Sequence, residues 1–164
     1  MVLRGWALAK SSAPDEGIPQ IRTMIDLWRS FGSELCVPYF YALLGDACLE
    51  AGRVDDGIEA VNAGLEIAER TEDRWYEAEL LRLGGALRLR RGDAADEVAQ
   101  RFTKAMDVAR GQGARLFELR AAVALARLDG SPASRETVSA LCAAFDDGLD
   151  VPDLITTRAV AGAS

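Results

Sequence analysis

The chain has no histidine, and this absence removes much of the catalytic repertoire. Histidine-dependent serine and cysteine nucleophiles, histidine-ligated zinc and imidazole acid–base catalysis all need that side chain. Carboxylates remain, as the adjacent pairs Asp15/Glu16, Asp55/Asp56 and Asp96/Glu97. Each pair falls where a helix is expected to begin, and negative charge there complements the helix dipole. We interpret the pairs as helix-start charges, and we expect neither catalytic residues nor a cofactor.

Cysteine is also scarce, with three residues and no Cys-x-x-Cys motif. Cys36 and Cys48 are predicted to share one helix, which would separate them by roughly 18 Å at about 1.5 Å per residue. A disulfide needs Cα atoms within about 7 Å, so this pair cannot bridge. We interpret the cysteines as small buried side chains in a reduced cytoplasm.

Long apolar runs are missing as well. No run of about 18 apolar residues is present, so no transmembrane helix is expected. The N-terminus has no usable apolar stretch for a signal peptide. The acidic cluster Asp146, Asp147, Asp150 and Asp153 lacks the spacing and final Glu of an EF-hand, so we expect a solvated turn and no metal.

Net charge is −7, which argues against general nucleic-acid binding. The charge is uneven: residues 1–73 carry −7, residues 74–127 carry +4 and residues 128–164 carry −4. A positive centre flanked by negative ends is therefore expected.

What the chain does contain is an internal repeat of about forty residues. Gly5, Gly45 and Gly85 are equidistant, and two further glycine pairs keep the same spacing: Gly17 with Gly57 and Gly52 with Gly92. Several coincidences in register indicate a repeated structural unit.

Apolar residues recur at helical spacing throughout, and alternation of period two appears nowhere for long. Eight helices are expected, at about 2–10, 14–31, 34–51, 55–71, 74–91, 94–111, 114–128 and 132–146, with a short capping helix near 152–162. Ser12, Asp93 and Ser131 are predicted N-caps, and Gly52 and Gly92 are predicted to end helices in the left-handed conformation. Linkers of two to four residues favour antiparallel neighbours.

The spacing Tyr41-x-x-Leu44-Gly45-x-x-Cys48 resembles the first helix of a tetratricopeptide repeat (TPR). Leu80-x-x-Leu83-Gly84-x-x-Leu87 fits too, although Gly85 matches the forty-residue period better. Units of this length resemble the degenerate TPR arrays at the C-terminal ends of large bacterial regulators that join cyclase or DNA-binding domains to signalling ATPase domains. The segments 4–9, 74–80, 109–114, 118–122 and 151–154 carry that resemblance. It implies no catalytic residues, and the chain has no phosphate-binding loop.

The expected fold is all-α: a right-handed α-solenoid of about four antiparallel hairpins in a single domain, residues 1–164. The units are about 1–33, 34–72, 73–112 and 113–148, and a C-terminal cap spans 149–164. Because solenoids need polar end caps, the short first hairpin is predicted to leave Leu3, Trp6 and Leu8 poorly covered. A partner, a second copy or a longer chain would cover them, and we expect a homodimer through this end.

In a TPR-like stack the first helix of each hairpin lines a concave groove. The predicted groove residues, which face away from the apolar stripes, are Tyr39, Asp46, Leu49, Glu79, Arg82, Ala86 and Arg90. We expect them to contact a peptide or partner helix, with arginine and aspartate setting its orientation.

Two further groups allow more than one interpretation. The arginines of the positive centre form either an anion-binding site or a solvated face with local Glu/Asp partners: Arg82, Arg88, Arg90, Arg91, Arg101 and Arg115. Trp6, Trp28 and Trp75 are interpreted as core or inter-repeat packing.

The preferred function is a regulatory protein–protein interaction module in the cytoplasm that binds a protein or peptide, not nucleic acid or membrane. A helical domain that senses a small molecule is the alternative. An enzyme that uses carboxylates or cysteine ranks last.

Overall fold

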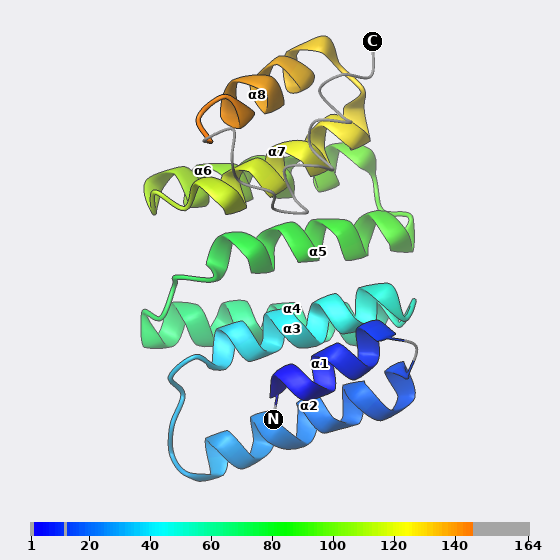
Figure 1. Cartoon of the computed structure of the whole chain (residues 1–164), viewed down its shortest axis with the longest axis vertical. Helices are drawn as coiled ribbons and strands as arrows, with labels where there is room; N and C mark the ends of the chain where they lie inside the picture. Colours follow the sequence, from blue (N-terminus) through cyan, green and yellow to red (C-terminus); the bar gives the residue numbers. More distant parts are fainter. Residues whose placement is uncertain (1, 12, 146–164) are drawn as a thin grey trace.

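The computed structural model describes residues 2–11 and 13–145, and within these ranges the chain is helical without strands (Figure 1). The helices are α1 (Val2–Ser11), α2 (Pro14–Ser30), α3 (Val37–Glu50), α4 (Val54–Thr71), α5 (Glu77–Arg91), α6 (Ala95–Gly111), α7 (Arg115–Asp129) and α8 (Pro132–Cys142). The predicted all-α class and the order of its helices are confirmed. The predicted capping helix near 152–162 lies outside the described residues.

α3 begins three residues later than predicted, so the placement of Cys36 inside this helix was wrong. Pro38 has no N–H to donate to the carbonyl of residue 34, which prevents a regular helix there. Cys36 instead takes a left-handed conformation, with φ of 63°. Its N–H donates to Oδ2 of Asp73 at 2.9 Å, and this bond helps to offset the strain. Cys36 and Cys48 form no disulfide, as expected.

α5 also starts three residues late, and α8 ends at Cys142, short of the predicted 146. Residues 74–77 form a turn in which the Glu77 N–H donates to the carbonyl of Arg74 at 3.0 Å. The Gln112 side chain donates to that same carbonyl at 2.7 Å. A contact from the end of α6 thus holds this turn outside the helix.

The predicted helix caps have mixed outcomes. Ser131 caps α8, because its side chain accepts the Ser134 N–H at 3.1 Å. Gly92 ends α5 at φ of 94°, a conformation that favours glycine. The Asp93 prediction was wrong: its carboxylate accepts Nε and Nη2 of Arg91 at 2.7 and 2.6 Å and caps no backbone N–H of α6. Ser12 lies outside the described residues.

The helices form two layers, with the odd-numbered helices toward the viewer in Figure 1. Each helix packs against its neighbours in sequence. In addition, α1 packs on α3, α3 on α5 and α5 on α7. No two even-numbered helices of the described part pack backbone to backbone, and α2 and α4 meet through the side chains of Arg22 and Asp56, 3.3 Å apart. The odd-numbered helices therefore form a continuous packed face.

The three equidistant glycines occupy equivalent places, each facing the second helix of its own hairpin. A Cβ on Gly5 would lie 3.0 Å from the Gly17 carbonyl oxygen and 3.0 Å from Ile21. A Cβ on Gly45 would meet Val61 at 2.8 Å, and one on Gly85 would meet the Phe102 ring at 2.5 Å. Glycine is needed at these crossings because the helices approach too closely for a side chain.

Buried apolar side chains form a core spread along the stack. One cluster joins α1 to α4, a second joins α3 to α5, and a third joins α5 to α8. Fully buried Ile21, Leu44, Leu80 and Leu119 lie in successive hairpins. Each cluster extends beyond one hairpin, so neighbouring hairpins share the core.

Candidate functional site

Six aromatic rings form a continuous strip across four helices. Trp28 comes from the last turn of α2, and the others lie at or just before the starts of the odd-numbered helices. We call Trp28, Tyr39, Phe40, Trp75, Tyr76 and Phe117 the aromatic strip. It forms because these helices start side by side, so that their first turns meet at one end of the packed face.

Each ring of the strip contacts the next. The centroids of Trp28 and Phe40 lie 5.8 Å apart, and those of Phe40 and Tyr39 lie 5.9 Å apart. Tyr39 and Tyr76 are 4.8 Å apart, with Trp75 packed on both at 5.4 and 4.9 Å. Phe117 completes the strip, 5.1 Å from Tyr76. Edge-to-face contacts of this kind fix ring orientation and stabilise the strip beyond simple burial.

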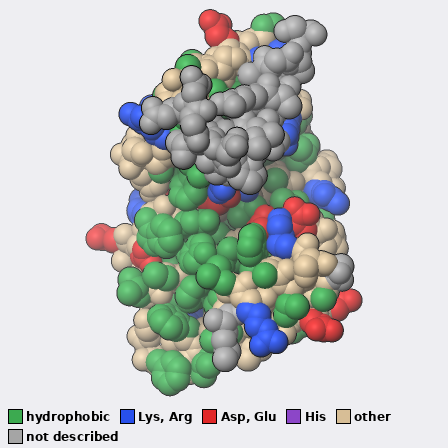
Figure 2. All heavy atoms as spheres, in the orientation of Figure 1, with side chains coloured by type: hydrophobic (Ala, Val, Ile, Leu, Met, Phe, Trp, Pro, Cys, Tyr) green, Lys and Arg blue, Asp and Glu red, His purple; other side chains and the backbone are tan. Residues whose placement is uncertain are grey.

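Much of this region faces solvent. The side chain of Trp75 is 48% exposed and that of Trp28 is 38% exposed. In the loop that follows α2, the side chains of Phe31 and Leu35 are 76% and 67% exposed. Figure 2 shows the hydrophobic side chains gathered over α3 and α5 on the face turned to the viewer. Trp28 and Trp75 are therefore not core residues, but each packs on a ring of the neighbouring unit, Phe40 and Tyr39 respectively, as the inter-repeat alternative predicts.

Beside the strip lies a partly buried group of charges, which we call the charged cluster: Asp46, Glu79, Arg82 and Arg120. Glu79 accepts Nε and Nη2 of Arg82, both at 2.9 Å, and Nη1 of Arg120 at 3.3 Å. Its side chain is only 7% exposed. Burial opposes the Arg82 charge, but the charge and hydrogen bonds of Glu79 outweigh it and raise the pKa of Arg82.

The strip and the charged cluster adjoin at Tyr76. Burial is the main cause that raises the pKa of this phenol to about 12, and the negative charge of Glu79 adds to it. Phe117 links the two from the other side, because the guanidinium of Arg120 lies 5.8 Å from its ring centroid. A ligand on the strip would therefore meet aromatic surface edged by fixed charge.

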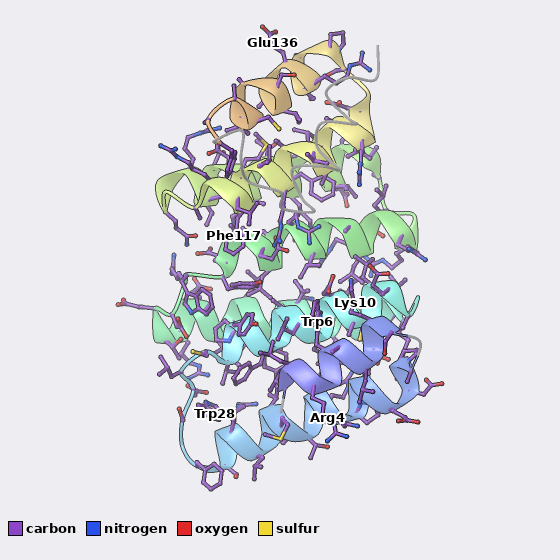
Figure 3. All side chains as sticks on the ribbon, in the orientation of Figure 1. Arg4, Trp6, Lys10, Trp28, Phe117 and Glu136 are labelled. Carbon is purple, nitrogen blue, oxygen red and sulfur yellow. The ribbon has the colours of Figure 1, made fainter. Side chains whose placement is uncertain are left out.

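α1 contributes the third part of this face. Nε1 of Trp6 donates to Oδ2 of Asp46 at 2.8 Å, and Nζ of Lys10 lies 3.3 Å from the same oxygen. Lys10 also donates to Glu50 at 3.0 Å. Figure 3 shows Trp6 and Lys10 extending from α1 over α3, so the inter-repeat role predicted for Trp6 is confirmed.

The structure brings together four of the seven predicted groove residues: Tyr39 in the strip, and Asp46, Glu79 and Arg82 in the charged cluster. Leu49 is half-buried against the core cluster of α3 to α5. Ala86 and Arg90 lie farther along α5, away from the strip at its start, and Arg90 is exposed. Their predicted binding role stays a prediction.

Sequence reasoning did not identify the strip as a unit. The tryptophans were expected to pack in the core or between repeats, and this expectation does not join them to the other rings. Aromatic pairs at the starts of two helices, Tyr39-Phe40 and Trp75-Tyr76, were the available signal. Helical periodicity could not reveal it, because Trp75 and Tyr76 precede the first residue of α5.

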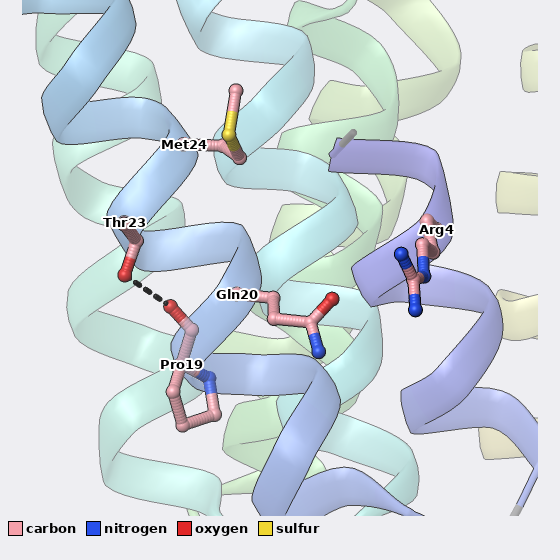
Figure 4. Close-up of a pocket in the computed structure, with 5 residues that line it drawn as sticks. All are labelled: Arg4, Pro19, Gln20, Thr23 and Met24. Atoms are coloured by element: carbon pink, nitrogen blue, oxygen red, sulfur yellow. Dashed lines mark hydrogen bonds between the residues drawn. The ribbon is translucent and has the colours of Figure 1, made fainter.

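A separate pocket of about 310 Å³ lies between α1 and α2 (Figure 4). Its lining residues are Arg4, Pro19, Gln20, Thr23 and Met24. Among the residues that the structure describes, no group of three or more His, Cys, Asp or Glu side chains could hold a metal ion. In that same part of the chain, no helix is long and apolar enough to cross a membrane.

No protein-family model matches the chain, and no solved structure matches it. An uncharacterized protein of Rhizobium meliloti (strain 1021) is 29% identical to it over 121 residues. That match covers 74% of this chain but only 12% of the relative. The chain is thus similar to one region of a much longer protein and spans about one-eighth of its length.

Proposed function

We propose that this chain is a protein–protein interaction module, a right-handed TPR-like α-solenoid that binds a peptide or partner helix on the face of its odd-numbered helices. The observation that carries the proposal is the aromatic strip, continuous from α2 to α7, in which Trp28 and Trp75 are exposed and the other rings are half-buried. Aromatic anchors beside arginine are typical of the residues that dominate binding energy at protein interfaces. A regulatory role in the cytoplasm and the division into four units belong to the same proposal.

The longer relative supports this proposal. A region that makes up about one-eighth of a protein is suited to bind the other regions of that protein, or to bind the proteins on which they act. The charged cluster supports it as well. Glu79, Arg82 and Arg120 are held by one another, so they offer an ordered polar edge at little cost in side-chain entropy.

The test is capture of partners from native lysate, followed by affinity measurement with each partner recovered. Trp75→Ala should weaken binding by about 2 kcal/mol, roughly thirty-fold in Kd, because an exposed anchor is lost. Leu89→Ala is the matched control, since Leu89 is an exposed apolar residue outside the strip at 44% exposure. Equal affinities for the wild type and both variants would refute the strip as the binding surface.

A second variant tests the polar part of the groove. Arg82→Glu/Arg90→Glu should lower the recovery of a partner oriented by these arginines. Because Arg82 is paired with Glu79, its replacement also disturbs the charged cluster, so Arg90→Glu alone separates binding from stability. Undiminished recovery by both variants would remove Arg82 and Arg90 from the groove.

The alternative is a small-molecule sensor, and the pocket between α1 and α2 is the observation that favours it. Its volume of about 310 Å³ is near the lower end of the range for ligand sites. A metabolite that raises the melting temperature of the wild type but not of Gln20→Trp, which fills the pocket, would support the sensor. Absence of any such shift across a metabolite library would count against it.

We also propose self-association through the first hairpin. Leu3 and Leu27 are 58% and 45% exposed on α1 and α2. Sedimentation equilibrium at micromolar concentration should show a dimer, and Leu3→Glu/Leu27→Glu should shift it to a monomer because burying unpaired charge is costly. A wild-type chain that sediments as a monomer would contradict this prediction.

A further inference from the structure

Three arginines gather on the side of α5 that faces away from the charged cluster. Arg88 follows Glu79 by nine residues, and at about 100° per residue this places it on the opposite side of the helix. Arg91 lies three residues further along α5 and Arg101 lies on α6. Both are close enough to Arg88 for their charges to act on it.

The partners of these arginines differ. Arg91 is held by Asp93 through two short hydrogen bonds. Arg88 has only neutral acceptors: its Nη1 donates to the Gly84 carbonyl at 3.2 Å, and its Nη2 donates to Oδ1 of Asn62 at 3.3 Å. Within residues 2–11 and 13–145, no carboxylate oxygen forms an ion pair within 4.0 Å of Arg88 or Arg101.

The charges around Arg88 sum to an excess of positive charge. Burial lowers the pKa of Arg88, and the charges of Arg101 and Arg91 lower it further. Asp93 opposes them at Arg88, whereas Asp93, Asp55 and Glu97 all act on Arg91. The charge of Arg91 is therefore offset, and Arg88 and Arg101 remain as two guanidinium groups that no described carboxylate pairs within 4.0 Å.

The contributing side chains come from three helices. α5 packs on both α4 and α6, which do not contact each other. Asn62 on α4 and Arg101 on α6 therefore flank Arg88 from the two sides. With its Oδ1 accepting from Arg88, the Asn62 amide still has N–H groups to donate.

We propose that Arg88 and Arg101, with Asn62 beside them, bind a phosphate group. Two guanidinium groups offer positive charge and N–H donors to a phosphate dianion, and guanidinium forks match phosphate oxygens in geometry. Arg91 is held by Asp93 and is not part of the proposed site. This site is separate from the aromatic strip and does not depend on the proposed interaction function.

The experiment titrates the protein with inorganic phosphate at constant ionic strength, with heat of binding and melting temperature as readouts. Sulfate serves as a second dianion, and acetate and chloride serve as monoanions. The expected result is saturable binding of phosphate and sulfate, at least tenfold weaker in Arg101→Gln. Monoanions should give no saturable response.

Matched variants keep the result interpretable. Arg101→Gln removes a charge that the described structure pairs with no carboxylate, so it should fold normally. Arg88→Gln also loses the bonds to Gly84 and Asn62 and is measured second. Arg115→Gln, an exposed arginine at the start of α7, should bind phosphate as the wild type does. A phosphate response that equals that of acetate, or that is unchanged in both Arg88→Gln and Arg101→Gln, would overturn the proposal.

A further arm identifies the source of the phosphate. A phosphoserine peptide is compared with inorganic phosphate and with the unphosphorylated peptide. Tighter binding of the phosphopeptide indicates a phosphate carried by a protein, and equal binding indicates a free phosphate or metabolite. Either result supports the site, provided that Arg101→Gln weakens it.

Discussion

Gly17 marks a point of very close approach between α1 and α2. A Cβ at this position would lie 2.4 Å from the Gly5 carbonyl oxygen and 2.5 Å from the Ala9 nitrogen, both backbone atoms. Rotation of a side chain cannot relieve such a contact. α1 and α2 would have to move apart, and the two layers of the fold would separate at the first hairpin.

We therefore expect Gly17→Ala to lower the free energy of unfolding by about 1–3 kcal/mol, the usual range for overpacking. Gly111→Ala is the control, because nothing lies within 4 Å of a Cβ there and the residue ends a helix. It should be neutral or stabilising by up to about 1 kcal/mol. Urea denaturation measures both, and equal values would contradict the close-approach explanation.

Cys48 makes stability depend on alkaline pH. Burial raises the pKa of its thiol from 9.0 to about 11, so the native state disfavours the thiolate. The unfolded chain releases this proton at lower pH than the native chain, and the stability from Cys48 is therefore lost as pH rises from about 9 to 11. Below pH 9 this contribution is fully present.

Replacement of Cys48 by alanine should flatten this part of the pH profile. The difference between wild-type and Cys48→Ala unfolding free energies, measured by urea denaturation under reducing conditions, should shrink between pH 9 and 11. Tyr76 produces a similar loss between about pH 10 and 12 in both proteins, so it cancels in the difference. A difference that stays constant across this range would contradict the buried-thiol account.

At the scale of single elements, α8 depends on its cap. Among the described helices it packs on α7 alone, and Ser131 satisfies one backbone N–H of its first turn. Asp129 accepts the backbone N–H of Ser131 at 2.9 Å and so holds the cap in place.

Ser131→Ala should cost about 1 kcal/mol. Ser139→Ala, on the exposed side of the same helix, removes a hydroxyl without a cap role and serves as the control. Amide hydrogen exchange in α8 is the measurement, because the loss is expected there first. Unchanged exchange in Ser131→Ala would show that Ser131 does not hold the helix end.

The helices were predictable because their apolar spacing and glycine stops are local signals. The start of α3 carries a local signal in Pro38 that was missed. Contacts distant in sequence also hold both starts, since Asp73 binds the Cys36 N–H and Gln112 binds the Arg74 carbonyl. Tyr39, Asp46, Glu79 and Arg82 were found as surface candidates, but their joining into one face depends on how the hairpins pack.

For the whole molecule, each helix contacts only its close neighbours in the stack. In such an arrangement stability is roughly a sum of local terms, and the ends have fewer of them. Native-state hydrogen exchange should thus show the slowest amides in α3 to α6 and faster ones in α1 and α8. Equal protection in all helices would indicate a single cooperative unit and contradict this prediction.

Adjacent hairpins pack on each other mainly through their odd-numbered helices, and this determines how the stack can deform. The odd-numbered helices act as a spine, tied by Trp6 to Asp46 and by the rings from Phe40 to Phe117. Among the described even-numbered helices, α2 and α4 are tied only by the Arg22–Asp56 ion pair, which is partly exposed and therefore weak. Bending that fans them apart or draws them together is therefore soft, while sliding or stretching along the spine is stiff. The curvature of the molecule is its most adjustable property.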